Sequence, residues 1–251
     1  MDSKAITAAA TLLVEARRSG RHLAGLPPEL RPGTVAEAHA VQAAATRKLG
    51  KATGGWKANA PPDGETQWGV LFEELIFPSP ARIPAKLVPL LGVEGEIAFR
   101  FLADLPERAA DYTREEVAAA VVAFPAIEVV DTRFGDFMKA TPLERLADHG
   151  SNGAFVAGLP VAGWRALALA KLHVTLTVGE KTIVDQVGGH PTGDPLQPAV
   201  ALANAMREAG GIRRGQLVTT GSCTGMNFAK PGDSVVARFE GLGTAEVSFT
   251  A

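Results

Sequence analysis

A short run of the sequence, GVEGEIAFR at residues 92–100, places two glutamates inside an otherwise apolar segment. Read as a β-strand, the segment points successive side chains to opposite faces. Glu94 and Glu96 then share one face, roughly 7 Å apart along the strand. Gly95, on the other face, leaves room for a close approach from the far side. The pattern fits either an edge strand with a solvated acidic face or a strand that presents two carboxylates to a site.

A second segment, PAIEVVDTRF at residues 125–134, sharpens the choice. Glu128 has apolar neighbours on both faces, so this strand is expected to be buried on both sides. An isolated buried carboxylate is very costly unless a salt bridge or a metal ion compensates it. Three carboxylates on neighbouring strands form an all-oxygen site of the kind that suits Mg²⁺ or Mn²⁺. No His or Cys pair has the spacing of a zinc site.

The chain changes character near residue 65. Helical spacing predicts helices at 3–19 and 34–49, the second with Thr34 and Glu37 as a capping box, and the Gly- and Pro-rich stretch 50–65 is expected to be irregular. Short helices are expected at 113–122 and about 196–209. Strand-like segments rich in Val, Ile and Phe occupy 69–77, 87–102, 121–134, 172–179, 181–188, 215–222, 233–241 and 244–250. We therefore expect an α+β fold, with a helical segment and the loop that contains Lys57 at 1–65 and a β domain at 66–251.

Composition argues against several classes of partner and cellular environment. The formal net charge of −2 and the scattered basic residues argue against nucleic acid or an anionic membrane surface as partner. The single cysteine, Cys223, excludes an internal disulfide and fits a reducing compartment. No apolar stretch approaches the roughly 20 residues of a transmembrane helix, and the N-terminus is typical of an amphipathic helix rather than a signal peptide. We expect a cytoplasmic protein.

Several motifs resemble one known superfamily. Besides GVEGEIAF and PAIEVVDTRF, they are GGWKANA (54–60), ADHGSNGAFVAG (147–158), GHP (189–191), LANAM (202–206) and the C-terminal run 215–249. In this order and over nearly the whole chain they resemble the fumarylacetoacetate hydrolase superfamily, in particular its branch of 2-keto-4-pentenoate hydratases and 4-oxalocrotonate decarboxylases. The resemblance implies a mixed β-roll preceded by a helical segment, and homo-oligomers.

The resemblance also implies roles for individual residues. The implied metal ligands are Glu94, Glu96 and Glu128; the implied catalytic residues are Lys57 and Asp148; the implied substrate-binding residues are Ser151, Ser222 and Thr224. The substrate would be a 2-keto acid or its enol. Near Mg²⁺ and in a partly dry site, the pKa of the lysine is expected to fall, as general base catalysis requires. Taken alone, the lysine reads as a surface residue and Asp148 as the cap of a turn.

The implied reaction is hydration of a 2-keto-4-pentenoate, as in aromatic catabolism. Decarboxylation of the 4-oxalocrotonate type, C–C hydrolysis of an acylpyruvate and a non-catalytic partner subunit remain alternatives. The sequence departs from the family on the loops that would face the substrate. The stretch after Lys57 carries two prolines, Gln67 stands where some hydratases have an acidic residue, and His149 enters the segment 147–158. These departures affect the choice of substrate more than the metal ligands.

Overall fold

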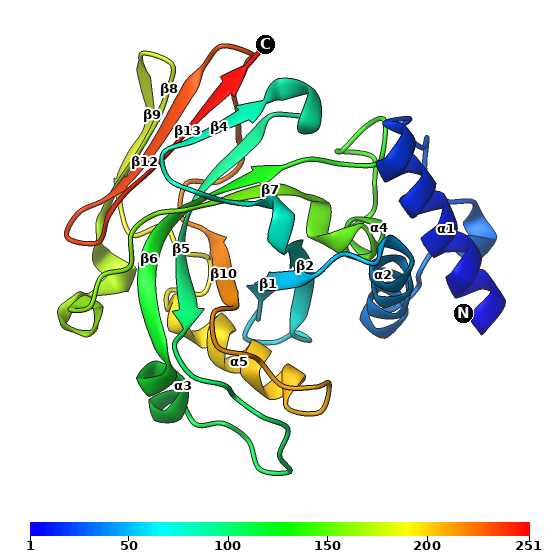
Figure 1. Cartoon of the computed structure of the whole chain (residues 1–251), viewed down its shortest axis with the longest axis horizontal. Helices are drawn as coiled ribbons and strands as arrows, with labels where there is room; N and C mark the ends of the chain where they lie inside the picture. Colours follow the sequence, from blue (N-terminus) through cyan, green and yellow to red (C-terminus); the bar gives the residue numbers. More distant parts are fainter.

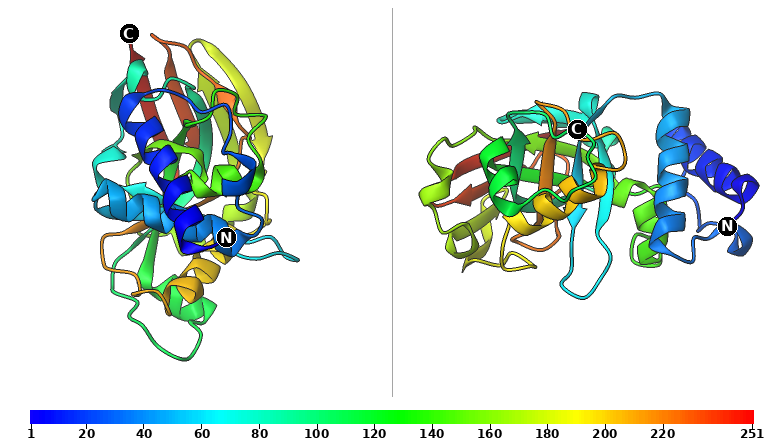
Figure 2. Two further views of the ribbon diagram at one scale, coloured as in Figure 1. Left: turned by 90° about the vertical axis from the view of Figure 1, so that its right-hand side faces the viewer. Right: turned by 90° about the horizontal axis from the view of Figure 1, so that it is seen from below.

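The computed structural model describes residues 1–251, which form a curled β-roll with a helical segment at one side (Figure 1). The helices are α1 (Ser3–Ser19), α2 (Val35–Leu49), α3 (Arg114–Ala120), α4 (Pro142–Ala147) and α5 (Leu196–Met206). Helices α1 and α2 pack against each other, and α4 lies between them and the roll (Figures 1 and 2). None of the helices is long and apolar enough to cross a membrane.

The two N-terminal helices form where the sequence predicts them. The Thr34 hydroxyl accepts a hydrogen bond from the backbone N–H of Glu37 at 3.1 Å and so caps α2. The reciprocal bond of a capping box is absent, because the Glu37 carboxylate accepts from the N–H of Gly33 instead, at 2.7 Å. Gly50 ends the helix in the left-handed conformation. The apolar faces of α1, α2 and α4 share a separate small core of 13 buried residues.

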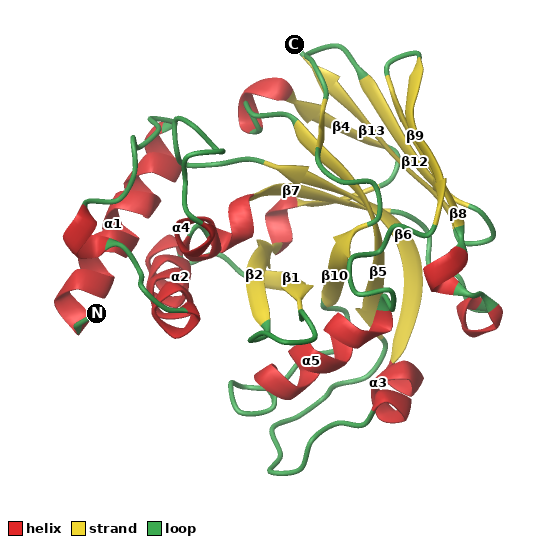
Figure 3. Ribbon diagram, turned by 180° about the vertical axis from the view of Figure 1, so that it is seen from behind, coloured by secondary structure: helices red, strands yellow, loops and turns green.

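The larger of two sheets forms the wall of the roll (Figure 3). Its strands run in the order β2-β1-β10-β5-β6-β7-β3, and β11 adds to β5. Their bounds are β1 (Thr53–Asn59), β2 (Gln67–Phe72), β3 (Ile76–Pro78), β5 (Gly92–Phe101), β6 (Val121–Val130), β7 (Asn152–Ala157), β10 (Leu217–Ser222) and β11 (Asn227–Phe228). Parallel and antiparallel pairs are mixed, since β1 pairs parallel with β10 and β3 with β7.

A smaller sheet packs against the outer side of the roll. Its order is β4-β13-β12-β8-β9, with bounds β4 (Ala81–Pro84), β8 (His173–Val178), β9 (Lys181–Val187), β12 (Ser234–Phe239) and β13 (Gly243–Thr250). Strand β12 contacts β5 and β6, and β13 contacts β6 and β7. The main core of 44 buried residues includes both sheets and α5. The expected α+β fold with a mixed β-roll is confirmed.

The sequence-based expectation about the two glutamate strands holds in detail. Strands β5 and β6 pair antiparallel, with Glu94 directly opposite Glu128, and every residue of β6 is buried. Gly95 allows a close approach: a Cβ there would lie 3.0 Å from Cγ2 of Thr224 and 3.2 Å from Cβ of Ala237 on β12. The carboxylates therefore face the interior of the roll, while the opposite face of β5 enters the core.

Two expectations about local structure are wrong, and strands β4, β7 and β11 were not expected. Residues 53–59, expected to be irregular, form β1, which lies between β2 and β10 in the larger sheet. The predicted strand 69–77 is divided into β2 and β3 by a short 3₁₀ turn at Glu73–Leu75. The segment after the 147–151 loop is strand β7, for which no strand was expected. The division of the chain at residue 65 stays a prediction, and β1 joins the N-terminal part to the roll by backbone hydrogen bonds to β2 and β10.

Candidate metal centre and active site

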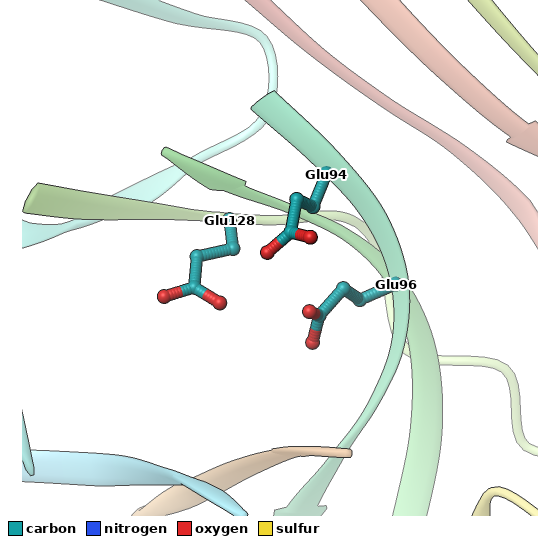
Figure 4. Close-up of side chains that lie close together, drawn as sticks. All are labelled: Glu94, Glu96 and Glu128. Carbon is teal, nitrogen blue, oxygen red and sulfur yellow. The ribbon is translucent and has the colours of Figure 1, made fainter. Parts of the chain in front are cut away.

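Three glutamates converge inside the roll. Glu94 and Glu96 point inward from β5 and Glu128 from the adjacent β6 (Figure 4). One carboxylate oxygen from each lies within 4.8 Å of the others. Glu96 and Glu128 are buried, and Glu94 is partly exposed. Two adjacent strands in fixed register thus hold three acidic groups at a separation that one cation can bridge.

The pKa of Glu96 shows that placing three carboxylates this close together is unfavourable. Its Oε2 accepts hydrogen bonds from the hydroxyl of Thr219 and, at 3.3 Å, from the N–H of Gly221. Burial, followed by the charges of Glu128 and Glu94, nevertheless raises the pKa of Glu96 to about 8. Burial and the charge of Glu128 also raise the pKa of Glu94. Positive charge placed among these carboxylates would stabilise them.

Glu128 is only partly satisfied by its protein partners. Its Oε1 accepts hydrogen bonds from Nζ of Lys57 at 2.7 Å and from Nδ2 of Asn152 at 3.2 Å. Its Oε2 is buried and has no hydrogen-bond partner, which is rare for a buried charged oxygen. Together with oxygens from the two further carboxylates, this unpaired buried oxygen provides the oxygen ligands that a hard divalent cation needs. The residues present therefore fit a divalent metal ion.

Lys57 reaches this centre from β1, between two glycines. A Cβ at Gly150 would lie 2.8 Å from Cδ of Lys57, and one at Gly69 would lie 3.0 Å from its Cγ. Burial opposes the charge of the lysine, but Glu128, Glu94 and Glu96 outweigh it and raise the pKa of Lys57. The expected fall of this pKa beside Mg²⁺ stays a prediction, because the combined charge of the carboxylates alone favours the ammonium form of Lys57. A lowered pKa requires a cation that neutralises them.

Two neighbouring cavities open onto the centre. The first, of about 280 Å³, is lined by Lys57, Glu94 and Glu96 together with Gln67 and Ser222. The second, of about 270 Å³, shares Lys57 and Glu94 and is lined further by apolar residues such as Val130, Phe137 and Met226. A larger cavity of about 760 Å³ lies elsewhere and contains none of these residues. The smaller pair is where a small molecule would meet both the carboxylates and the lysine.

The predicted substrate-binding residues divide into two groups. Ser222 lines the first cavity and Ser151 the second, where the buried Ser151 hydroxyl has no hydrogen-bond partner. Thr224 lines neither cavity: its hydroxyl accepts the N–H of Gly95 at 2.8 Å and so braces the strand between Glu94 and Glu96. Its position suits a positioning role.

Asp148, predicted to be catalytic, also lies outside the two cavities. Its Oδ1 accepts a hydrogen bond from Nε of Arg133 at 2.6 Å, and its Oδ2 accepts from the N–H of the same residue at 3.1 Å. Both side chains are buried. Asp148 therefore holds the loop that carries Gly150 and Ser151, and it touches neither the carboxylates nor the lysine through any hydrogen bond or ion pair.

The departures from the family pattern fall around the cavities. His149 is buried; its Nε2 lies 3.0 Å from the hydroxyl of Thr46 on α2, and its Nδ1 has no partner. His149, Gly150 and Ser151 all have positive φ values, between 54° and 63°. Two non-glycine residues in the left-handed backbone conformation indicate stored strain, which is common at functional sites. Gln67 lines the first cavity.

Sequence reasoning missed two residues of this region. Asn152 hydrogen-bonds Glu128 from β7, and Arg145 on α4 lines both cavities. Asn152 lies within the segment 147–158 and directly after Ser151, which is the one signal that could have found it. Nothing in the sequence around Arg145 marks it, since only the fold brings α4 to the centre.

Together these features define a β-roll protein whose interior holds a three-carboxylate centre beside a buried lysine. The chain belongs to the fumarylacetoacetate hydrolase C-terminal family, whose model matches residues 40–250. Among curated proteins it is 29% identical to the 2-keto-4-pentenoate hydratase of Paraburkholderia xenovorans (strain LB400), over 96% of this chain and 93% of that protein. It is also 29% identical to the 2-hydroxyhexa-2,4-dienoate hydratase of Comamonas testosteroni, over 95% of each.

Solved structures agree on the fold. The 4-oxalocrotonate decarboxylase from Pseudomonas putida G7, complexed with magnesium and adipate, superposes with a TM-score of 0.86 at 23% identity, over 99% of this chain and 98% of that one. The fumarylacetoacetate hydrolase from Exiguobacterium antarcticum gives a TM-score of 0.61 at 16% identity, over 80% of this chain and 76% of the other. The decarboxylase therefore shares the N-terminal helical segment as well as the β-roll.

Proposed function

We propose that this chain is a divalent-metal-dependent lyase of the 2-keto-4-pentenoate hydratase kind, which adds water to a 2-keto acid in its dienol form during aromatic catabolism. The observation that carries the proposal is the meeting of Glu94, Glu96 and Glu128 with Lys57 at two small cavities. The hydratase names of relatives that match nearly the whole chain support it. The magnesium complex of the similar decarboxylase supports a divalent cation.

Glu94, Glu96 and Glu128 would hold Mg²⁺ or Mn²⁺, which would supply Lewis-acid polarisation of the carboxylate and keto oxygens of a 2-keto acid. The chain's own groups do the rest. Lys57 is placed to give and take a proton at the cavity, because its Nζ hydrogen-bonds Glu128 while its side chain packs against Gly69 and Gly150. Lys57 would give a proton to one carbon of the conjugated chain, the oxygen of a water molecule would add to another, and the proton that this water loses would restore the lysine.

The hydroxyls of Ser222 and Ser151 orient the substrate. Each lines one of the two cavities, and the Ser151 hydroxyl has no partner within the protein that would compete for it. Both are suited to hydrogen-bond the substrate carboxylate. Thr224 and Asp148 position the residues that make contact, through the N–H of Gly95 and the buried Arg133.

Thermal unfolding tests the centre before any substrate is known. Oxalate resembles the chelating end of an enolised 2-keto acid, so Mg²⁺ and oxalate together should raise the melting temperature more than either alone. A ligand at about 100 times its Kd stabilises by about 2.7 kcal/mol, which is roughly 5–11 °C for a chain of this size. Glu128→Gln should abolish the shift. An unchanged melting temperature in the wild type would indicate that the carboxylates are structural and that the chain is a non-catalytic family member.

Kinetics then test the reaction. With 2-hydroxypenta-2,4-dienoate, loss of the ultraviolet absorbance of the diene reports addition of water. Lys57→Ala should lower kcat by about 100-fold or more, the usual contribution of a positioned acid or base, while metal and oxalate still raise the melting temperature. Retained kcat in this variant would remove Lys57 from the mechanism.

Two alternative reactions would use the same centre. The decarboxylase neighbour supports loss of CO₂ as the second candidate, and C–C hydrolysis of an acylpyruvate is the third. Measuring uptake of water, release of CO₂ and release of an acid product separates the three. We further propose that the protein is cytoplasmic and that it forms a homo-oligomer. Light scattering after size exclusion would test the oligomeric state.

A further inference from the structure

The inward face of β5 extends beyond the carboxylate centre. Alternate side chains of a strand point to the same side, so Arg100 continues the row of Glu94 and Glu96, which point into the roll (Figure 4). At about 3.4 Å a residue, Arg100 lies roughly 14 Å beyond Glu96 along the strand. The interior of the roll therefore has a second end, at which an arginine takes the place of the glutamates.

A layer of apolar side chains separates the two ends. It is a cluster of seven buried residues, which includes Ala98 on β5, Ala126 on β6 and Leu217 on β10. Each of these three lies two positions along its strand from a residue of the carboxylate centre, namely Glu96, Glu128 and Thr219, the hydrogen-bond partner of Glu96. This cluster, which we call the apolar layer, divides the interior of the roll into two compartments.

The compartment beyond the apolar layer is a cavity of about 760 Å³. Ala157 and Leu217 of the apolar layer line it, so the layer forms its inner wall. Ile76 and Phe77 of β3 extend the apolar part of the lining. Neither Lys57 nor any of the three glutamates lines it. The cavity is therefore separate from the candidate active site.

Three arginines also line this cavity, and none of them makes an ion pair within 4.0 Å. Arg100 is half-buried, its guanidinium carbon lies 5.6 Å from the ring centroid of Phe124, and its Nη1 donates to the carbonyl oxygen of Gly215 at 3.1 Å. Burial lowers the pKa of Arg100, so an anion beside it would stabilise the charged form. Arg213 and Arg214 are exposed.

The carboxylates close to the cavity offset only part of this charge. Glu73 is the one acidic residue of the lining, and Oδ1 of Asp104 accepts a hydrogen bond from the backbone N–H of Arg214 at 2.6 Å. Three arginines against these two carboxylates leave one formal positive charge. A monoanion would balance it, and a carboxylate matches the planar fork of a guanidinium through two parallel hydrogen bonds.

We propose that this cavity is a second ligand-binding site, which takes a monocarboxylic acid with an apolar body. The carboxylate faces the three arginines, and the body lies against the apolar layer and the side chains of Ile76 and Phe77. The inference does not depend on the proposed function, because the apolar layer separates this cavity from the carboxylate centre.

Three matched probes test the ligand class. Hexanoate has both the charge and the apolar body, acetate lacks the body, and hexan-1-ol lacks the charge. Binding is measured by calorimetry on the full chain in an excess of Mg²⁺ and oxalate, which occupy the carboxylate centre. We expect hexanoate to bind about 10-fold or more tightly than either of the other two, which corresponds to about 1.4 kcal/mol.

Substitution of the arginines supplies the second arm. Arg100→Gln should weaken hexanoate binding about 10-fold and leave the binding of oxalate in Mg²⁺ unchanged. Arg213→Gln combined with Arg214→Gln alters only exposed side chains and so preserves the fold; it should weaken hexanoate binding about threefold or more. Arg238→Gln is the control, since Arg238 is exposed on β12 and lies outside the cavity; it should change nothing.

The outcomes separate this inference from the proposed function. Equal affinities for hexanoate and acetate, or no binding of hexanoate, would overturn the second site. An unchanged affinity for hexanoate in the variant that lacks both Arg213 and Arg214, together with the same result or failure to fold in Arg100→Gln, would overturn it as well. Hexanoate binding that depends on these arginines where oxalate fails to bind in Mg²⁺ would support the second site and refute the proposed function.

Discussion

Adding one methyl group at Gly150 should displace the lysine while leaving the three carboxylates in place. The added Cβ would lie 2.8 Å from Cδ of Lys57 and 3.3 Å from its Cε. Carbon atoms in contact prefer separations of about 3.5–4.0 Å, so the lysine chain must retreat by about 0.7 Å or more. Retreat moves Nζ away from Glu128, to which it now donates at 2.7 Å.

The size of the effect follows from this displacement. A misplacement on the order of 1 Å can cost about 100-fold in rate, so Gly150→Ala should lower kcat by a factor approaching that. The backbone adds a separate cost, because Gly150 has a φ of 63°. An L-residue in this left-handed region costs about 1–2 kcal/mol, which lowers the melting temperature by roughly 2–8 °C.

Gly50→Ala separates the two effects. Gly50 has a φ of 65°, and a Cβ there meets nothing within 4 Å. This variant should lose similar stability and retain full kcat. The assay is the rate of diene loss with 2-hydroxypenta-2,4-dienoate, alongside thermal unfolding of both variants. Equal kcat values for Gly150→Ala, Gly50→Ala and the wild type would refute the idea that glycine at 150 sets the position of the lysine.

Three further predictions concern stability. Arg133→Met leaves the buried Asp148 carboxylate with only the longer ion pair to Arg17, at 3.9 Å, and should cost about 3 kcal/mol; a loss under 1 kcal/mol in urea unfolding would contradict it. Gln42→Ala removes hydrogen bonds that join α2 to β2 and α4, at about 1–3 kcal/mol for each buried group left unpaired; an unchanged urea midpoint would argue against that linkage. Burial, then Arg17 and Arg133, lowers the pKa of His149 well below its usual value, so the unfolded chain binds the proton first. Stability should be complete above pH 6.5 and fall below it by up to about 1.4 kcal/mol per pH unit, with a shallower fall in His149→Gln.

The sequence predicted the strands that hold the carboxylates because their pattern is local. Alternation along β5 put Glu94 and Glu96 on one face, and the apolar neighbours of Glu128 indicated a strand buried on both sides. Burial of charge then required a compensating group, which is a chemical argument independent of the fold. These inferences needed only neighbours within a few residues along the chain.

Strand β1 was not predicted, because the sequence alone does not show why its glycines are needed. Gly54 and Gly55 read as turn residues, yet a Cβ at Gly55 would overlap the backbone of Leu217 on the paired strand β10. The glycine marks close packing of two strands that are distant in the sequence. Arg145 was missed for a similar reason, since it is on a six-residue helix whose contact with the cavities depends on the whole fold.

The site is assembled from two kinds of structural support, and this affects how such an enzyme could diversify. The carboxylates are fixed by ten paired positions between β5 and β6, the longest ladder in the molecule. The wall facing them comes from the one-and-a-half-turn helix α4 and from a loop with positive φ angles. Substitutions on α4 can therefore retune which molecules are accepted without disturbing the ladder. Descendants of one ancestor could exchange substrates while inheriting the same reactive core.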